Sequence, residues 1–260
     1  MENDFPPLVQ RAMAAARRLG FPLTREEAGP GGGPSASLPG TGRFLAMLAA
    51  GCSGRNALIG ELGTGTGLGS AWMASAMPEG CALVTAELDP DRAAAAREVF
   101  ADDPRVTVVT GDARTVIGSR GPYDLLFSDG GGGTDPVLVD WLRIGGRIVF
   151  DDVTPGRPVD GDPKREFMFR DPRLVPVEVA LPTLRDSLLV GTRIRLFLDK
   201  GGRGAEGGER VGHDQEAGRE LVEGRGPAAG RGRAGDAGRR AYHAAAGQDP
   251  LEVRRGHRMA

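Results

Sequence analysis

The sequence predicts an α/β fold: a doubly wound, mostly parallel sheet with helices on both faces and an antiparallel hairpin at its C-terminal end. Three observations predict it. Short apolar runs of the kind that form buried parallel strands recur along residues 57–152, helix-like stretches separate them, and two further apolar runs follow with only a short link between them. Alternating strands and helices are typical of βαβ units, whereas consecutive strands with a short link can pair only in the antiparallel sense.

The elements follow one another in a regular order. Residues 7–19 carry Leu8, Met13 and Leu19 among alanines and arginines, a spacing that predicts an amphipathic helix. The stretch GPGGGPSASLPGTG (29–42) is expected to be a flexible connection, and a second helix is expected over residues 43–50. Short strands and helices then alternate up to the hairpin, with strands at 57–62, 82–88, 105–111, 123–129 and 146–152, helices at 68–77, 91–101 and 136–142, and hairpin strands at 174–181 and 187–198.

Composition divides the chain into three parts: an N-terminal helix with its flexible connection (1–40), one α/β domain (41–199) and a tail (200–260). The last 60 residues contain 15 glycines, 11 arginines and only seven large apolar residues. Such a stretch buries too little apolar surface to offset its ordering entropy, so we predict that the tail is disordered. The frame-shifted end of a GC-rich gene would have the same composition.

The lack of a visible targeting signal or membrane span, together with the cysteine content, makes a soluble cytoplasmic protein the expectation. The formal net charge of −2 argues against a basic nucleic-acid-binding arm, although Arg-Gly pairs in the tail leave a weak RNA-binding alternative. The acidic start shows no signal peptide, and no apolar run approaches the roughly 18 residues of a membrane span. Cys52 and Cys81 make neither a disulfide framework nor a zinc pattern.

The stretch ELGTGTGLGS (61–70) is the predicted cofactor loop, because it ends the first strand and opens the helix that follows. Glycines there permit a tight turn and close approach to a ligand, and the helix N-terminus offers free N–H groups. A nicotinamide fingerprint fails in both frames, since its third glycine or alanine falls on Leu68 or Ser70, and no P-loop lysine is present. Glu87 ends the second strand, where a carboxylate can accept hydrogen bonds from both hydroxyls of a ribose; this feature alone would suit NAD equally well.

Four motifs in this order and spacing, ELGTGTGLG, TAELD, GDA and LLFSD, resemble those of the class I S-adenosylmethionine (SAM) dependent methyltransferases. The resemblance covers roughly residues 40–198 and implies a Rossmann-like fold with the terminal hairpin. An acid at the position of Glu61 would repel a pyrophosphate but favour the ammonium of a bound amino acid. The resemblance implies that Glu61 and the glycines hold the methionine end, Glu87 the ribose, and Asp112 with Ala113 the adenine; Asp112 could instead be a turn residue. The SAM-binding residues implied are Glu61, Gly63, Thr64, Gly65, Gly67, Glu87, Leu88, Asp112, Ala113 and Asp129.

Three carboxylates are expected to converge beside the methyl group: Asp129 after the fourth strand, and Asp151 and Asp152 at the end of the fifth. Such a cluster raises its own pKa values unless a cation neutralises it, and oxygen ligands suit Mg²⁺ or Ca²⁺. The trio is similar to that of the metal-dependent O-methyltransferases of the catechol and caffeoyl-CoA type, in which the ion lowers the pKa of a substrate hydroxyl. The sequence differs from that family twice, with Asp152 in place of asparagine and Gly132 in place of a lysine. In the alternative interpretation Asp129 contacts SAM and Asp152 only caps a turn.

These features predict a SAM-dependent methyltransferase that transfers a methyl group in line to a hydroxyl of a small molecule, with Asp129 as the catalytic residue and with or without a divalent ion. All three histidines lie in the tail, which disfavours a histidine base. Lys164 could substitute for the absent lysine, but we favour a surface position for it. Residues 154–173 form a candidate substrate lid, or alternatively a contact in a homodimer. The other function classes are a non-catalytic SAM-binding protein and a nicotinamide-dependent, NAD(P)-linked oxidoreductase.

Overall fold

The structure is a computed structural model, and it describes residues 4–28, 35–37, 39–53, 56–129, 133–181 and 186–196. The tail at 200–260 lies outside the described residues, as do most of the 29–38 connection and the glycines at 130–132. None of the helices in the described ranges combines the length and the apolar character that crossing a membrane requires.

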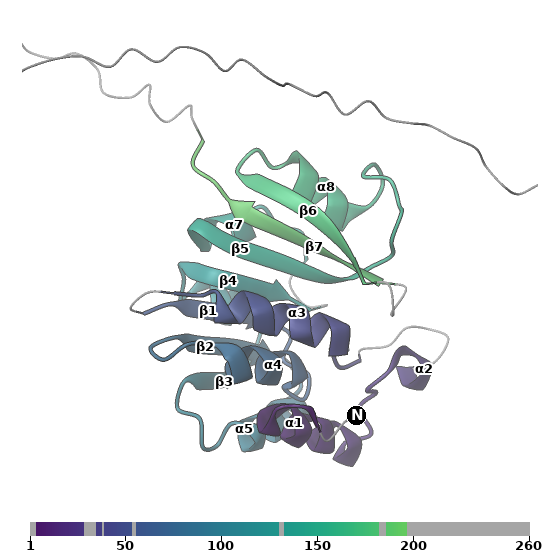
Figure 1. Cartoon of the computed structure of the whole chain (residues 1–260), viewed down its shortest axis with the longest axis vertical. Coiled ribbons are helices and arrows are strands. Elements are labelled where there is room, and N and C mark those ends of the chain that lie inside the picture. Colours follow the sequence, from purple (N-terminus) through teal and green to yellow (C-terminus); the bar gives the residue numbers. More distant parts are fainter. Residues whose placement is uncertain are drawn as a thin grey trace, which may run out of the picture. The chain divides into compact units, whose positions relative to one another are not determined.

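Seven strands form one sheet in the order β3-β2-β1-β4-β5-β7-β6, as Figure 1 shows from β3 beside α5 to β6 beside α8. The first five strands pair in parallel, and β7 pairs antiparallel with both β5 and β6. The predicted fold class is therefore confirmed. The strands span Leu58–Leu62 (β1), Ala82–Glu87 (β2), Val106–Thr110 (β3), Tyr123–Ser128 (β4), Leu142–Val153 (β5), Leu174–Leu181 (β6) and Asp186–Arg193 (β7).

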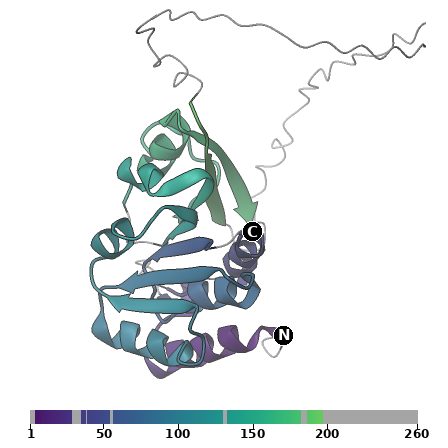
Figure 2. The ribbon, with the colours of Figure 1, turned by 90° about the vertical axis from the view of Figure 1, so that its left-hand side faces the viewer.

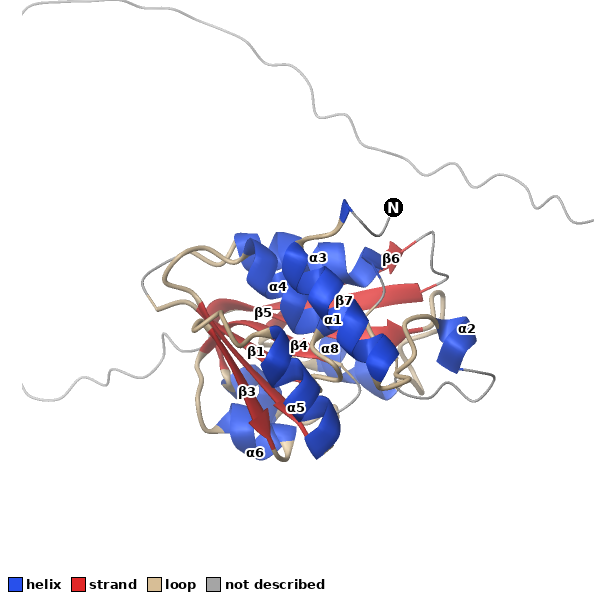
Figure 3. Cartoon of the chain, turned by 90° about the horizontal axis from the view of Figure 1, so that it is seen from below, coloured by secondary structure: helices blue, strands red, loops and turns tan. Residues whose placement is uncertain are grey.

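Helices cover both faces of the sheet, and each layer has its own core (Figures 2 and 3). One core joins the sheet to the N-terminal helices and to α4 and α5, and the other joins it to α6, α7 and α8. Because both faces are covered, the central strands are apolar along most of their length. The helices span Pro7–Arg18 (α1), Arg25–Ala28 (α2), Pro39–Ala50 (α3), Leu68–Ala76 (α4), Pro90–Val99 (α5), Ala113–Gly118 (α6), Val137–Asp140 (α7) and Pro163–Arg170 (α8).

The end of the predicted flexible connection is helical, which corrects the sequence interpretation. Helix α3 begins at Pro39, so residues 39–42 belong to it. Proline suits the first turn of a helix, where its missing N–H is not needed. A Cβ at Gly42 would collide with the Trp72 ring of α4, so this glycine allows two helices to pack closely. Its role is packing rather than flexibility.

Three further differences concern short or charged segments. Helices α6 and α8 were not expected, and each is started by an aspartate whose side chain accepts a backbone N–H, Asp112 from Thr115 and Asp162 from Arg165. Strand β5 begins at Leu142, four residues before the predicted start, and this shortens the helix predicted for 136–142.

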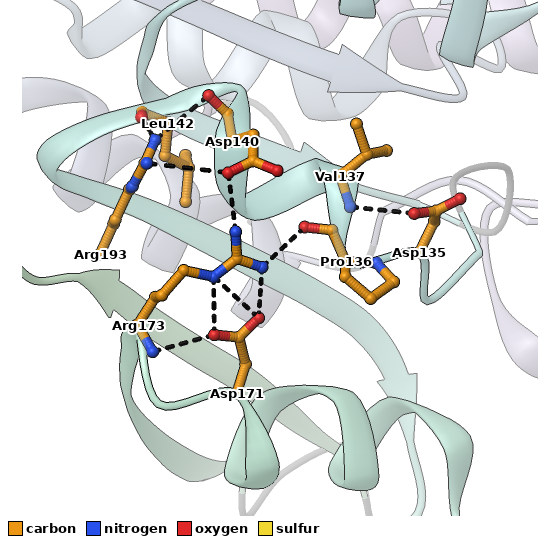
Figure 4. A network of polar contacts seen from close by, with 8 residues as sticks. All are labelled: Asp135, Pro136, Val137, Asp140, Leu142, Asp171, Arg173 and Arg193. Atoms are coloured by element: carbon orange, nitrogen blue, oxygen red, sulfur yellow. Dashed lines mark hydrogen bonds and ion pairs between the residues drawn. The ribbon is translucent and has the colours of Figure 1, made fainter. Parts of the chain in front are cut away.

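A polar network fixes the segment that follows the glycine run against the C-terminal hairpin (Figure 4). Arg173 pairs with Asp171 at 2.6 Å and with Asp140 of α7 at 2.7 Å, and it donates to the carbonyl of Pro136. Arg193 of β7 donates to the carbonyls of Asp140 and Leu142. The network therefore ties α7 and the start of β5 to the hairpin strands.

Candidate active site

The loop between β1 and α4 has the backbone that its glycines predict. Gly63, Gly65 and Gly67 have φ values of 97°, 54° and 90°, a region that side chains other than glycine rarely adopt. The backbone N–H groups of Gly63 and Thr64 donate to the carbonyl of Ala86, which fixes the loop against the end of β2. A Cβ at Gly63 would also collide with the backbone oxygen of Asp129. The loop therefore lies directly against the end of β4.

Glu61 supports this loop from inside the protein. Its side chain is 1% exposed and accepts hydrogen bonds from the hydroxyls of Ser70, in the first turns of α4, and Thr85 of β2. Burial raises the pKa of Glu61 to about 7, with the two hydroxyl donors opposing the shift and the charge of Glu87 adding to it. The carboxyl group therefore links β1 to α4 and β2 through these two hydrogen bonds. Its expected interaction with the methionine part of SAM stays a prediction.

The buried Glu61 predicts a specific dependence of stability on pH. The unfolded chain loses this proton near pH 4.5, whereas the folded protein keeps it to about pH 7. The folded state thus binds more protons in this window, so the free energy of unfolding should fall as pH rises from about 4.5 to 7, by roughly 3 kcal/mol from this group. Urea denaturation of wild type and Glu61→Gln across pH 4–8 measures the effect. The variant should gain stability relative to wild type as pH rises; a difference that does not change with pH would contradict the assignment.

Glu87, at the end of β2, accepts a hydrogen bond from the backbone of the cofactor loop. Its side chain is 7% exposed and accepts the N–H of Gly65 at 2.8 Å and that of Asp89 at 3.0 Å, while Arg92 lies 3.3 Å away in an ion pair. The Arg92 guanidinium lies over the Phe21 ring, and a Cβ at Gly65 would come within 3.3 Å of the same ring. The acid expected at the ribose therefore lies against the cofactor loop, under a cover from the N-terminal segment.

Two groups of residues were expected near the adenine: Leu88 after β2, and Asp112 with Ala113 at the start of α6. The structure gives them different surroundings. Leu88, next to Glu87, is 74% exposed, which is unusual for a large apolar side chain and suits a surface that a flat ring would cover. Asp112 is exposed and starts α6 by accepting the N–H and the hydroxyl of Thr115, which lower its pKa. Asp112 thus has a helix-capping role, and the adenine assignment of Asp112 and Ala113 stays a prediction.

The acids at the ends of β4 and β5 influence one another's protonation: the charges of Asp151 and Asp152 act on Asp129. Withdrawal from solvent raises the pKa of Asp129 well above its usual value, and the charges of Asp151, Asp152 and Glu61 raise it further. The register between β5 and β7 shifts between Phe150 and Val153, and Asp152 adopts a left-handed backbone with φ of 58°. The irregularity therefore lies at the two acids at the end of β5, and bulges are frequent next to functional sites.

The three acids do not fit the expected metal centre. Across the described ranges, no group of three or more histidine, cysteine, aspartate or glutamate side chains is arranged to hold a metal ion. Asp152 is exposed, Asp151 is 7% exposed, and one Asp151 oxygen accepts the backbone N–H of Asp152. The charges of Asp151 and Asp152 thus affect Asp129, but the three side chains are not arranged to bind a metal ion together. Gly132, at the position of the family lysine, lies outside the described residues.

Lys164 lies at these carboxylates, although the sequence favoured a surface position. Its side chain is half-buried, and Nζ donates to the backbone oxygen of Asp151 at 2.6 Å. Its charge lowers the pKa of Asp129, against the effect of the neighbouring acids. Lys164 lies there because it belongs to α8, a helix that the sequence analysis did not predict and that places its side chain at the end of β5.

Sequence reasoning missed three residues around the loop. Phe21 and Arg92 belong to elements whose packing on the loop no local pattern shows. Thr66 lies within the glycine motif, is 1% exposed, and its hydroxyl is one of three buried side-chain atoms without a hydrogen-bond partner in the described part of the chain. An unsatisfied buried hydroxyl costs free energy, so such groups commonly mark a ligand or water position.

Comparisons with known proteins agree with this geometry. A family model described as a methyltransferase domain matches residues 61–153. A catechol O-methyltransferase of Niastella koreensis is 36% identical over 99 residues, which is 35% of this chain and 44% of the relative, so the match spans less than half of that protein. A protein of Mycobacterium tuberculosis named as an O-methyltransferase is 30% identical over 187 residues, or 62% of this chain and 79% of the relative. The solved O-methyltransferase from Bacillus cereus in complex with SAH (S-adenosylhomocysteine) shares the fold, with a TM-score of 0.57, 20% identity, and coverage of 73% of this chain and 91% of that one.

Proposed function

Because the chain belongs to the class I SAM-dependent methyltransferases and is similar to O-methyltransferases, we propose that it transfers a methyl group in line to a hydroxyl oxygen of a small molecule. The observation that carries the proposal is the contact between Gly63 and the backbone of Asp129. It joins the glycine loop to the carboxylate edge of the sheet, where ligands of open α/β sheets bind.

The residues fit SAM in three ways. The loop holds three glycines in left-handed conformations at the start of α4, Glu87 offers two carboxylate oxygens at the end of β2, and the Thr66 hydroxyl has no partner among the described residues. When bound, SAM supplies an activated methyl group on a sulfonium, and SAH is the leaving group. The chain's own task is to hold the acceptor in line with that methyl group and to exclude water.

Asp129 is the residue we assign to the acceptor side. It follows β4, next to the cofactor loop, and its neutral form is favoured by burial and by three neighbouring acids. A carboxyl group can accept a hydrogen bond from the acceptor hydroxyl, and its protonated form can also donate one. No step of the proposal uses a metal, because the three acids do not fit one.

The test is a methyl-transfer assay with labelled SAM against catechols, phenols and acyl-CoA esters, in EDTA and in Mg²⁺. We expect label in an O-methyl product, and SAM or SAH should raise the melting temperature whereas NAD should not. Stabilisation by NAD but not by SAM would favour the oxidoreductase alternative. Binding of SAM without transfer to any acceptor would favour the non-catalytic alternative. Activity that EDTA abolishes and Mg²⁺ restores would support the metal predicted from the sequence.

A further inference from the structure

One ammonium group lies at the backbone of Asp151, at the end of β5. Lys164 is the only lysine in the described ranges, since the other lysine of the chain, Lys200, lies outside them. Its Nζ is held 2.6 Å from the backbone oxygen of Asp151, and its field acts on Asp129. A positive charge therefore lies where the end of β4 meets the end of β5.

The backbone of Lys164 is held in place by its neighbour. Arg165 is 1% exposed and donates to Glu178 of β6, to Asp162 at the start of α8 and to the carbonyl of Thr154. These contacts hold α8 against the hairpin, so Lys164 projects from a fixed helix rather than from a mobile loop. A functional group on a fixed element is positioned more precisely than one on a loop.

The ammonium of Lys164 has more N–H donors than hydrogen bonds to described residues. A lysine ammonium carries three N–H donors. The carbonyl of Asp151 accepts one of them, and the structure gives Lys164 no other hydrogen bond to a described residue. With respect to the described residues, two donors are left for a group that enters this edge, and the neighbouring acids would repel an anion there if the lysine were absent.

We propose that Lys164 binds the oxygen of the methyl acceptor and holds it beside Asp129. This proposal rests on the proposed O-methyltransferase function and names the residue that receives the acceptor. The acceptor releases its proton to bulk solvent as it binds as an oxygen anion; that oxygen then forms the bond to the methyl carbon, while the methyl–sulfur bond breaks and its electron pair stays on sulfur. An ammonium stabilises the oxyanion by a charge-assisted hydrogen bond, so acceptors with acidic hydroxyls, such as phenols and enols, are favoured over aliphatic alcohols.

The effect of the Lys164 ammonium on a bound hydroxyl can be measured without turnover by using a phenol whose ionisation changes its absorbance. The full-length protein is saturated with SAH, a nitrophenol is added, and the absorbance of the bound nitrophenolate is followed against pH. Wild type should lower the pKa of the bound probe by about one unit or more. Lys164→Met should remove the shift, and Lys164→Arg should keep part of it because the charge remains. Arg170→Met is the matched control, since Arg170 is an exposed cation of the same helix, paired with Asp160.

Turnover provides the second measurement. Lys164→Met should lower kcat for phenol methylation about ten- to a hundredfold, with the Kd for SAM unchanged and with Lys164→Arg partly active. A probe pKa that does not shift in wild type, or a shift or kcat that survives in Lys164→Met, overturns the proposal. Failure of the wild-type protein to methylate any oxygen acceptor is a different result, because it removes the proposed function. Unchanged circular dichroism and SAM affinity show that a variant is folded.

Discussion

Replacing Glu87 with alanine is expected to weaken SAM binding about ten- to a hundredfold. Hydrogen bonds to a charged group contribute about 1.5 to 3 kcal/mol, and each 1.4 kcal/mol is about tenfold in affinity. Glu87 is at once the acid assigned to the ribose and the acceptor for the N–H of Gly65. The substitution therefore removes a ligand contact and also releases the loop that surrounds the ligand.

Calorimetric titration with SAM and with SAH measures this effect. Both ligands carry the same ribose, so both should lose affinity by a similar factor. Asp89→Ala is the control: Asp89 is the neighbouring acid and accepts the N–H groups of Asp91 and Arg92 at the start of α5. Its loss should cost about 1 kcal/mol of stability while the affinity for SAM stays the same. An unchanged affinity in Glu87→Ala would remove the ribose assignment.

The positions of the glycine loop and of Glu87 in the fold could be predicted from the sequence, because each depends on where a strand ends. The glycine loop and Glu87 each end a strand, and the ends of parallel strands share one edge of the sheet. Glu87 and Gly65 are far apart in the chain, yet they had to be neighbours once the strand order was known. The physical requirement for left-handed backbone at Gly63, Gly65 and Gly67 likewise acts within a single turn.

The acceptor side could not be predicted because distant partners determine it. The stretch PKREFMFR mixes charged and apolar residues, and nothing in it shows that Arg165 points inward while Arg170 points outward. That choice depends on Glu178, 13 residues away on β6. The position of Lys164 follows from it. The glycine run at 130–133 was conspicuous in the sequence, yet residues on α8 supply the charge at this edge.

Arg165→Met is expected to destabilise the protein by about 3 to 5 kcal/mol, because it leaves acidic partners without their counter-charge. Arg165 is 1% exposed and forms ion pairs with Glu178 at 2.7 Å and with Asp162 at 2.6 Å. It lowers the pKa of Glu178, so the ion pair stabilises the fold above the pKa of the unfolded glutamate, and this stabilisation is lost as pH falls. Urea denaturation at pH 7 and pH 4 should show a larger effect of the substitution at pH 7. Arg170→Met, which breaks an exposed pair on the same helix, should cost less than about 1 kcal/mol.

A double variant separates the two ways in which Arg165 could matter. If most of the loss comes from an unpaired acid, then Arg165→Met with Glu178→Met should recover part of the stability, because well-packed apolar residues often replace a buried ion pair at little cost. The fold would then tolerate an apolar contact between α8 and β6. If the double variant is stable and α8 stays in place, Lys164 keeps its position and phenol methylation should persist. Recovery of stability without recovery of methylation would show that the geometry of the Arg165 network, and not only its contribution to folding, sets the position of Lys164 at the acceptor.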